Sequence, residues 1–103
     1  MMLATNLNVS KSSLADFCRS HSIRRLAFFG SVVRDDFGPE SDVDCLVEFR
    51  EGHHPGWSIV ELEAEFSKLV GGRKVQFVNP KYLNRHMRDR ILTEAEDQYV
   101  GEG

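Results

Sequence analysis

Hydrophobic residues at helical spacing open the chain. Leu14, Phe17 and Cys18 would share one face of a helix, and residues 13–16 carry the serine and the acidic residue of a capping box. We therefore predict an amphipathic helix over about residues 10–20, with Ser13 near its start and its apolar face toward the core.

Two further apolar patterns predict strands. The run at 26–29 ends at Gly30, which is typical of a buried strand that leads into a turn. From 43 to 49 the apolar residues occupy every second position, and this period of two is the strongest strand signal in the chain. The alternation places Asp42 and Asp44 together on the face opposite the apolar set.

The second half of the chain predicts a loop, a helix, a strand and a last helix. Residues 50–57 are typical of a loop, and a capping box at Ser58 begins a helix that Gly71-Gly72 closes. Residues 74–78 alternate as a third strand, and Asn79-Pro80 would cap and start the last helix. Its buried stripe is expected at Leu83, Met87, Ile91 and Ala95.

This order of elements predicts a single α/β (α+β) domain over residues 1–103, with helices packed on a small mixed β-sheet. The composition, 41% hydrophobic and 28% charged, is that of a globular chain and excludes a disordered one. No apolar run approaches the roughly 20 residues of a membrane span, and residues 1–10 lack a signal-peptide pattern, so we expect a cytoplasmic protein without a membrane partner.

Charge and cysteine content narrow the function classes. A net charge of -3 argues against a surface devoted to long nucleic acid, but it leaves room for a local anion site. Cys18 and Cys45 have neither disulfide-framework nor metal-ligand spacing, so both are expected to be buried, reduced thiols.

The candidate chemistry lies in a Gly-Ser pair followed, ten residues later, by Asp-x-Asp. Gly30 would let the backbone approach a phosphate closely, and the amide and hydroxyl of Ser31 would donate to it, with Arg34 adding positive charge. Asp42 and Asp44 would lie about 6–7 Å apart and could hold one hard cation such as Mg²⁺. Each motif alone is common on solvated surfaces, so it is their combination that favours a site for a metal-bound nucleoside triphosphate.

Residues 28–34 (Phe-Phe-Gly-Ser-Val-Val-Arg) and 40–44 (Glu-Ser-Asp-Val-Asp) resemble the motif of the DNA polymerase beta-like nucleotidyltransferases, and specifically of the minimal nucleotidyltransferases. The turn at 71–75 and the segment 90–95 also look typical. The resemblance implies a polymerase beta palm-like fold and transfer of a nucleoside monophosphate, usually AMP from ATP, to an acceptor hydroxyl. It also implies that Asp42 and Asp44 bind metal while Gly30 and Ser31 hold triphosphate.

The same resemblance implies a biological setting. Minimal nucleotidyltransferases are commonly paired with a small helical HEPN protein in toxin–antitoxin modules, in some cases adenylylating a tyrosine of that partner. An antitoxin role with a HEPN-type partner is therefore the expected context. The sequence does not identify the nucleotide base or the oligomeric state, and a homo-oligomer is one of the alternatives.

The departure from the family pattern that matters most is on the third strand. The third catalytic carboxylate is typically an Asp on the third strand, and the matching residue here is Gln76. Loss of general-base help costs about 10²–10⁴ in rate. Glu48 shares the strand face but lies about 13 Å from Asp44 along the strand. The alternative to an active transferase is therefore a weak or inactive antitoxin that neutralises a helical partner by direct binding.

Overall fold

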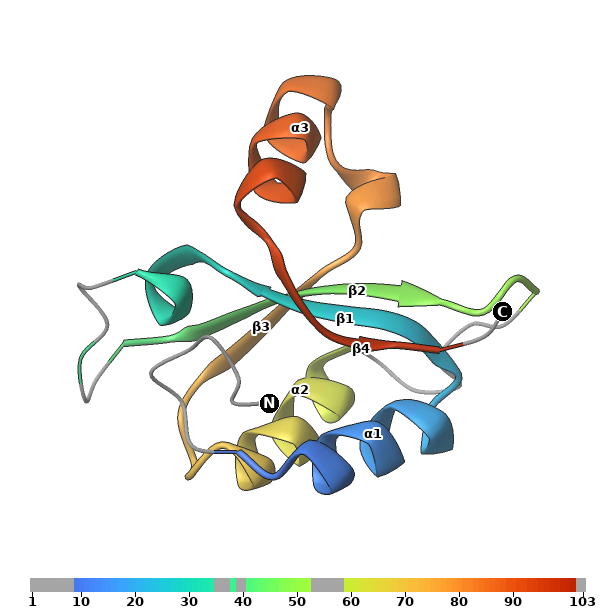
Figure 1. Ribbon diagram of the computed structural model, residues 1–103, viewed down its shortest axis with the longest axis vertical. Helices are drawn as coiled ribbons and strands as arrows, with labels where there is room; N and C mark the ends of the chain where they lie inside the picture. Colours follow the sequence, from blue (N-terminus) through green and yellow to red (C-terminus); the bar gives the residue numbers. More distant parts are fainter. Residues whose placement is uncertain (1–8, 35–37, 39–40, 53–58, 102–103) are drawn as a thin grey trace.

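The computed structural model describes residues 9–34, 38, 41–52 and 59–101. Nine elements follow one another in this part of the chain (Figure 1). In chain order they are the helix α1 (Lys11–Ser20), the strand β1 (Ile23–Phe29), the 3₁₀ turn η1 (Gly30–Val33), the strand β2 (Val43–Phe49), the helix α2 (Ile59–Leu69), the strand β3 (Val75–Val78), the 3₁₀ turn η2 (Pro80–Tyr82), the helix α3 (Arg85–Glu94) and the strand β4 (Glu96–Val100).

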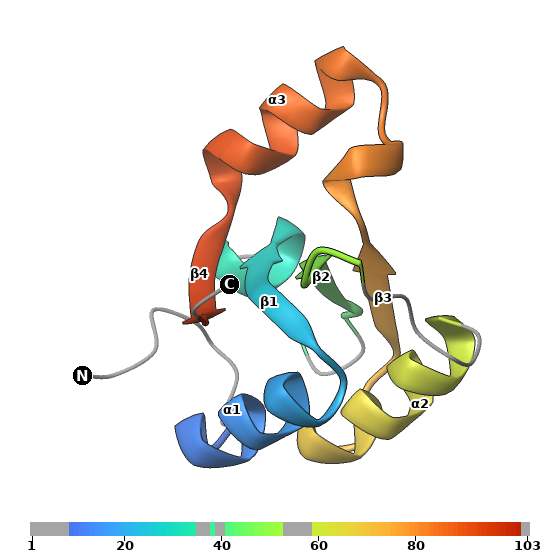
Figure 2. The ribbon, with the colours of Figure 1, turned by 90° about the vertical axis from the view of Figure 1, so that its right-hand side faces the viewer.

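The sheet is mixed, with strand order β3-β2-β1-β4. β2 and β3 run parallel, and the other two pairs run antiparallel. α1 and α2 cover one face of the sheet, whereas α3 stands over the opposite face, which we call the open face (Figure 2). The predicted small mixed sheet with helices packed on it is confirmed.

The core lies between the sheet and the helices α1 and α2. Phe17, Phe66 and Phe77 form an aromatic cluster there, with ring centroids 5.1 to 6.2 Å apart. The alternation of β2 behaves as predicted, because Val43, Cys45 and Val47 are fully buried beneath the helices. The side chains in between therefore point to the open face.

Local capping hydrogen bonds determine the start of the first helix and the end of the second. Ser10, and not Ser13, caps α1, since its hydroxyl accepts the Ser13 N–H at 3.3 Å. The predicted range of this helix is confirmed, but its predicted cap is wrong. α2 ends where predicted, at two glycines with positive φ, and the Gly72 N–H donates back to the Ser67 carbonyl at 2.8 Å.

The prediction of one long last helix from Asn79-Pro80 is wrong. Asn79 caps only the short η2, and Leu83 then returns to extended backbone. Asn84 starts α3 instead, because its side chain accepts the Met87 N–H at 2.9 Å. No residue of α3 is buried, so the predicted buried stripe is also wrong, and Met87 on it is 47% exposed.

The strand β4 was not predicted. Its sequence Glu-Asp-Gln-Tyr-Val lacks an apolar alternation, so the hydrophobic pattern gives no strand signal. The strand forms because its backbone pairs with β1, where Tyr99 lies opposite Leu26 and packs against the core. Its tertiary partner, and not its own residues, determines its structure.

The predicted cap at Ser58 and most of the loop before it, including His53 and His54, lie outside the described residues. α2 is present from Ile59, with Leu62 and Phe66 buried as its apolar stripe requires. Ile59 itself is 36% exposed, so the buried stripe of α2 begins at Leu62. Within the described part of the chain, no helix is both long and apolar enough to cross a membrane.

Candidate functional site

The turn after β1 brings its backbone against a carboxylate of β2. Phe29 pairs with Asp44 across the two strands, and Gly30 follows with φ of 76°. A Cβ atom built on Gly30 would lie 2.5 Å from Oδ2 of Asp44. Glycine is therefore required twice, once for the left-handed backbone and once for the close approach.

Gly30→Ala is expected to destabilise the protein more than a matched change at Gly71. Gly71 has φ of 75°, and no described atom comes within 4 Å of an added Cβ there, so Gly71→Ala measures the backbone cost alone, about 1–2 kcal/mol. Gly30→Ala adds the displacement of Asp44, about 1–3 kcal/mol more. Chemical denaturation of both variants checks this difference, and equal losses would contradict the close packing of Gly30 on Asp44.

Arg73 positions the segment that precedes β2 and carries Asp42. Its guanidinium Nη1 donates to the carbonyl oxygens of Gly38 at 2.8 Å and Ser41 at 3.3 Å. The Gly38 N–H also donates to the Ser41 hydroxyl at 2.9 Å. The sequence alone does not indicate this role for Arg73, because the contact spans more than 30 residues of chain.

Asp42 lies close enough to Asp44 to influence the ionisation of the Asp44 carboxyl. Burial raises the pKa of the Asp44 carboxyl, the charge of Asp42 raises it further, Arg34 opposes both, and Glu94 adds to the rise. Two partly buried carboxylates that repel each other are suited to a hard divalent cation, which would relieve the repulsion. The donor set thus fits one Mg²⁺ ion.

Asp44→Asn is expected to stabilise the metal-free protein at neutral pH. The folded-state pKa of Asp44 is raised. The contribution of Asp44 to the free energy of unfolding is therefore fully present only at acid pH, and it is lost as the pH rises through that pKa. Thermal melts in a chelator should therefore show a higher Tm for Asp44→Asn at pH 7, and the advantage should vanish below pH of about 4. Asp89→Asn, an exposed position on α3, is the control, and an equal or lower Tm for Asp44→Asn would contradict the account.

Gln76 lies beside Asp44. The two residues are register partners on the parallel strands β2 and β3, and the Gln76 side chain is exposed on the open face. β3 is held in place by α2, where Glu63 accepts the Phe77 N–H at 2.7 Å.

In the described ranges no group of three or more Asp, Glu, His or Cys side chains gathers in a way that could hold a metal ion. The described residues therefore contain no third carboxylate that completes a metal-binding group with Asp42 and Asp44.

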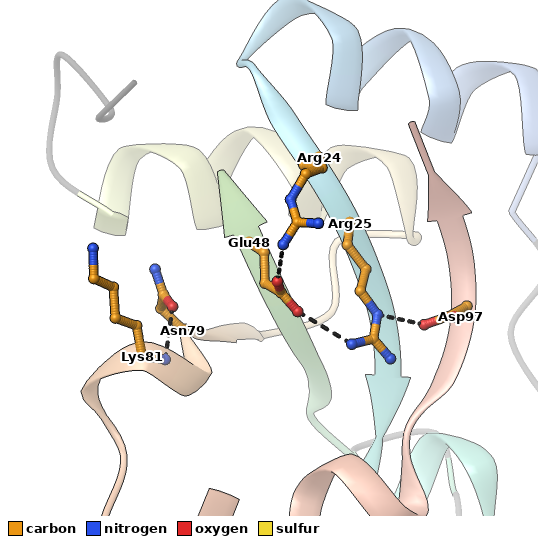
Figure 3. A network of polar contacts seen from close by, with 6 residues as sticks. All are labelled: Arg24, Arg25, Glu48, Asn79, Lys81 and Asp97. Carbon is orange, nitrogen blue, oxygen red and sulfur yellow. Dashed lines mark hydrogen bonds and ion pairs between the residues drawn. The ribbon is translucent and has the colours of Figure 1, made fainter. Parts of the chain in front are cut away.

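Glu48 forms ion pairs elsewhere on the open face. One of its oxygens accepts from Arg24 and the other from Arg25 at 3.1 Å, while Arg25 Nε also donates to Asp97 at 2.7 Å (Figure 3). The carboxylate lies near the far end of β2 from Asp42 and is neutralised by two guanidinium groups. It therefore cannot serve the Asp42–Asp44 pair.

Two of the cavities that described residues line lie along the open face. The larger, of about 910 Å³, surrounds the Glu48 network and extends to η2 and α3; its cationic and aromatic lining includes Arg24, Arg25, Arg50, Lys81, Tyr82 and Arg88. The smaller, of about 220 Å³, opens between the Gly30 turn and α3. Only the smaller one is lined by Gly30 and Arg34.

An acidic residue from α3 contacts the Gly30 turn. The Gly30 N–H donates to Oε1 of Glu94, and Nη1 of Arg34 donates to the same oxygen at 2.9 Å. The sequence alone does not indicate a role for Glu94, although this residue lies in the segment 90–95 that carries part of the family resemblance. The structure thus shows that the turn already binds a carboxylate.

Both cysteines are inert thiols, as predicted. Burial raises the pKa of Cys18 to about 12, and burial also raises the pKa of Cys45 well above its ordinary value. Neither thiol is therefore available as a nucleophile or metal ligand.

Comparisons with known proteins agree with this geometry. The nucleotidyltransferase domain model matches residues 11–97. The "Putative protein adenylyltransferase MJ0435" of Methanocaldococcus jannaschii is 33% identical over 92 residues, which is 89% of this chain and 97% of that protein. A solved "putative minimal nucleotidyltransferase" is 30% identical with a TM-score of 0.66, over 84% of this chain and 86% of that one. A crystal structure of a toxin-antitoxin with AMP-PNP shares the fold, with a TM-score of 0.73 at 14% identity over 91% of this chain and 76% of that one.

The mixed sheet, the glycine turn and the paired aspartates thus define a protein of the nucleotidyltransferase class. Since the family model spans most of the chain and the relatives align over most of their own length, the chain belongs to the nucleotidyltransferase domain family, among its minimal members.

Proposed function

We propose that this protein is a single-domain, Mg²⁺-dependent nucleotidyltransferase that transfers AMP from ATP to a hydroxyl of a partner protein. The observation that carries the proposal is the packing of the Gly30 backbone against Asp44, with Asp42 close enough to raise the pKa of that carboxyl. In this proposal the Gly30 turn binds phosphate, and the neighbouring pair of aspartates binds the cation. The similarity to a putative protein adenylyltransferase supports the choice of reaction.

Each residue of the site has a distinct role in this proposal. Gly30 and Ser31 begin η1, so their amides and the Ser31 hydroxyl can donate to phosphate oxygens. Arg34, at the end of η1, adds a positive charge. Asp42 and Asp44 hold Mg²⁺, which when bound would neutralise charge on the triphosphate.

The proposed transfer is a displacement at the α-phosphorus. The acceptor oxygen forms a new bond to that phosphorus, the bond from it to the oxygen bridging to the β-phosphate breaks, and pyrophosphate leaves. The acceptor proton passes to water, because the Gln76 amide beside Asp44 is not a base at neutral pH. The protein therefore contributes orientation and electrostatic stabilisation, and lacks general-base help.

We propose a small helical protein of HEPN type as the acceptor, and an antitoxin role for this chain. The support comes from the resemblance of the motif residues and from the shared fold with a toxin-antitoxin structure that contains AMP-PNP. An acceptor hydroxyl would reach the site along the open face, where Asp44 and Gln76 are both partly or fully exposed.

A second candidate function is an antitoxin that binds its partner without catalysis. The observation that favours it is the neutral Gln76 next to Asp44, together with the lack of a three-carboxylate group in the described part of the chain. In this case the nucleotide site would be regulatory or vestigial, and contact with the partner would suffice for neutralisation.

Incubation of the protein with labelled ATP, Mg²⁺ and the co-expressed partner tests the first proposal. Label is expected on the partner, and it should disappear with chelator and with Asp44→Asn. The second function would be established instead if the partner stays unlabelled over long incubations and the Asp42→Asn and Asp44→Asn variants still neutralise the toxicity of the partner fully.

A further inference from the structure

The carboxylate of Glu94 binds the two donors that a phosphate would need. Its Oε1 accepts from the Gly30 N–H and from Arg34, and the side chains of Glu94 and Arg34 are 36% and 51% exposed. A backbone N–H and a guanidinium converging on one oxygen are typical of anion recognition. The turn therefore holds an anion that belongs to the chain itself.

Glu94 stays in this position against two unfavourable effects. It is the last residue of α3, where the negative end of the helix dipole disfavours a carboxylate. Its charge also acts on Asp44, whose pKa it helps to raise. The contacts with Gly30 and Arg34 offset these costs, and a more strongly charged anion with its own cation would remove both.

The surroundings allow Glu94 to leave. α3 contains no buried residue, so a shift of its last turn breaks no core packing. The cavity of about 220 Å³ between the turn and α3 is lined by Gly30, Arg34 and Glu94, and also by Arg90, a second cation on the same helix. Displacement of one carboxylate would leave two arginines facing this space.

We propose that Glu94 is a tethered competitor of the triphosphate, held in the Gly30–Arg34 anion site until the nucleotide displaces it. This inference rests on the proposed function and adds a means of control to the same site. If the site can bind triphosphate only when Glu94 is released, its apparent affinity equals the intrinsic affinity multiplied by the fraction of molecules in which Glu94 is released. Any partner that pulls α3 away from the turn would then favour nucleotide binding.

The test is the affinity of Mg²⁺ tripolyphosphate, an anion without a base, for three forms of the full chain. Glu94→Gln keeps the shape of the side chain and removes its charge, and it should bind about tenfold more tightly than the unmodified protein if Glu94 occupies the site about 90% of the time. Asp89→Asn removes one charge from the same helix, five residues away, and should change the affinity little. Calorimetry measures all three.

Equal affinity of Glu94→Gln and the unmodified protein would overturn the inference, and so would weaker binding by Glu94→Gln, which would make Glu94 part of the nucleotide site. Absence of binding by every form would overturn it together with the anion site. Tighter binding by Glu94→Gln without any transfer from labelled ATP would uphold the inference while the proposed transferase activity fails.

Discussion

Gln76→Asp is expected to raise the rate of AMP transfer by about 10²–10⁴-fold, the usual contribution of a positioned general base. The gain follows from geometry, since residue 76 is the register partner of Asp44 on the neighbouring parallel strand. A carboxylate there would face the same space as Asp44 and could accept the acceptor proton. The rate of label transfer from ATP to the partner measures the effect.

Gln76→Asn is the matched control, because asparagine has the size of aspartate without its charge. The side chain at position 76 is exposed, so neither change should disturb the fold. No gain in Gln76→Asp, or an equal gain in both variants, would show that the missing carboxylate does not limit transfer.

The second large effect is expected from Asp42→Asn and Asp44→Asn, each of which should weaken Mg²⁺-dependent ATP binding by more than about 100-fold. Loss of residues that merely orient metal ligands already costs about 10–100-fold in metal affinity, and loss of a charged ligand should cost more. The pairing of the two carboxylates makes each necessary, since one alone would hold the cation weakly. Calorimetric titration of ATP with and without Mg²⁺ measures the loss.

Asp97→Asn provides the control for charge on the same face. Asp97 lies on β4, accepts from Arg25 and takes no part in the Gly30 turn (Figure 3). Its replacement should leave Mg²⁺-dependent ATP binding within about twofold of the unmodified protein. A loss as large as that of Asp44→Asn would mean that general charge, and not a defined metal pair, governs binding.

The sequence predicts those parts of the fold that depend only on residues close together in the chain. The alternation in β2 placed Asp44 on the open face, and the two glycines after α2 gave its end. The same kind of alternation in residues 74–78 placed Gln76 on the face of Asp44 once the two strands were known to be parallel. Period and turn chemistry thus sufficed to place Gly30, Asp44 and Gln76, whereas the binding roles of these residues stay predictions.

The parts that could not be predicted depend on distant partners. β4 forms through pairing with β1, about 70 residues earlier in the chain, and its own residues are mostly polar. Asn79 and Asn84 are both good helix caps, and the pattern could not tell which of them starts the longer helix. Glu94 and Arg73 act on segments that lie more than 30 residues away, so no spacing rule reveals them.

Nucleotide should bind at the Gly30 turn and the aspartate pair, although a larger cationic groove lies on the same face. An NMR titration of the labelled protein with Mg²⁺ and a non-hydrolysable ATP analogue tests this most directly. The amide signals of Gly30, Ser31 and Asp44 should shift first, and only when Mg²⁺ is present. Shifts confined to Arg24, Arg50 and Tyr82 in the groove, or no shifts at all, would contradict it.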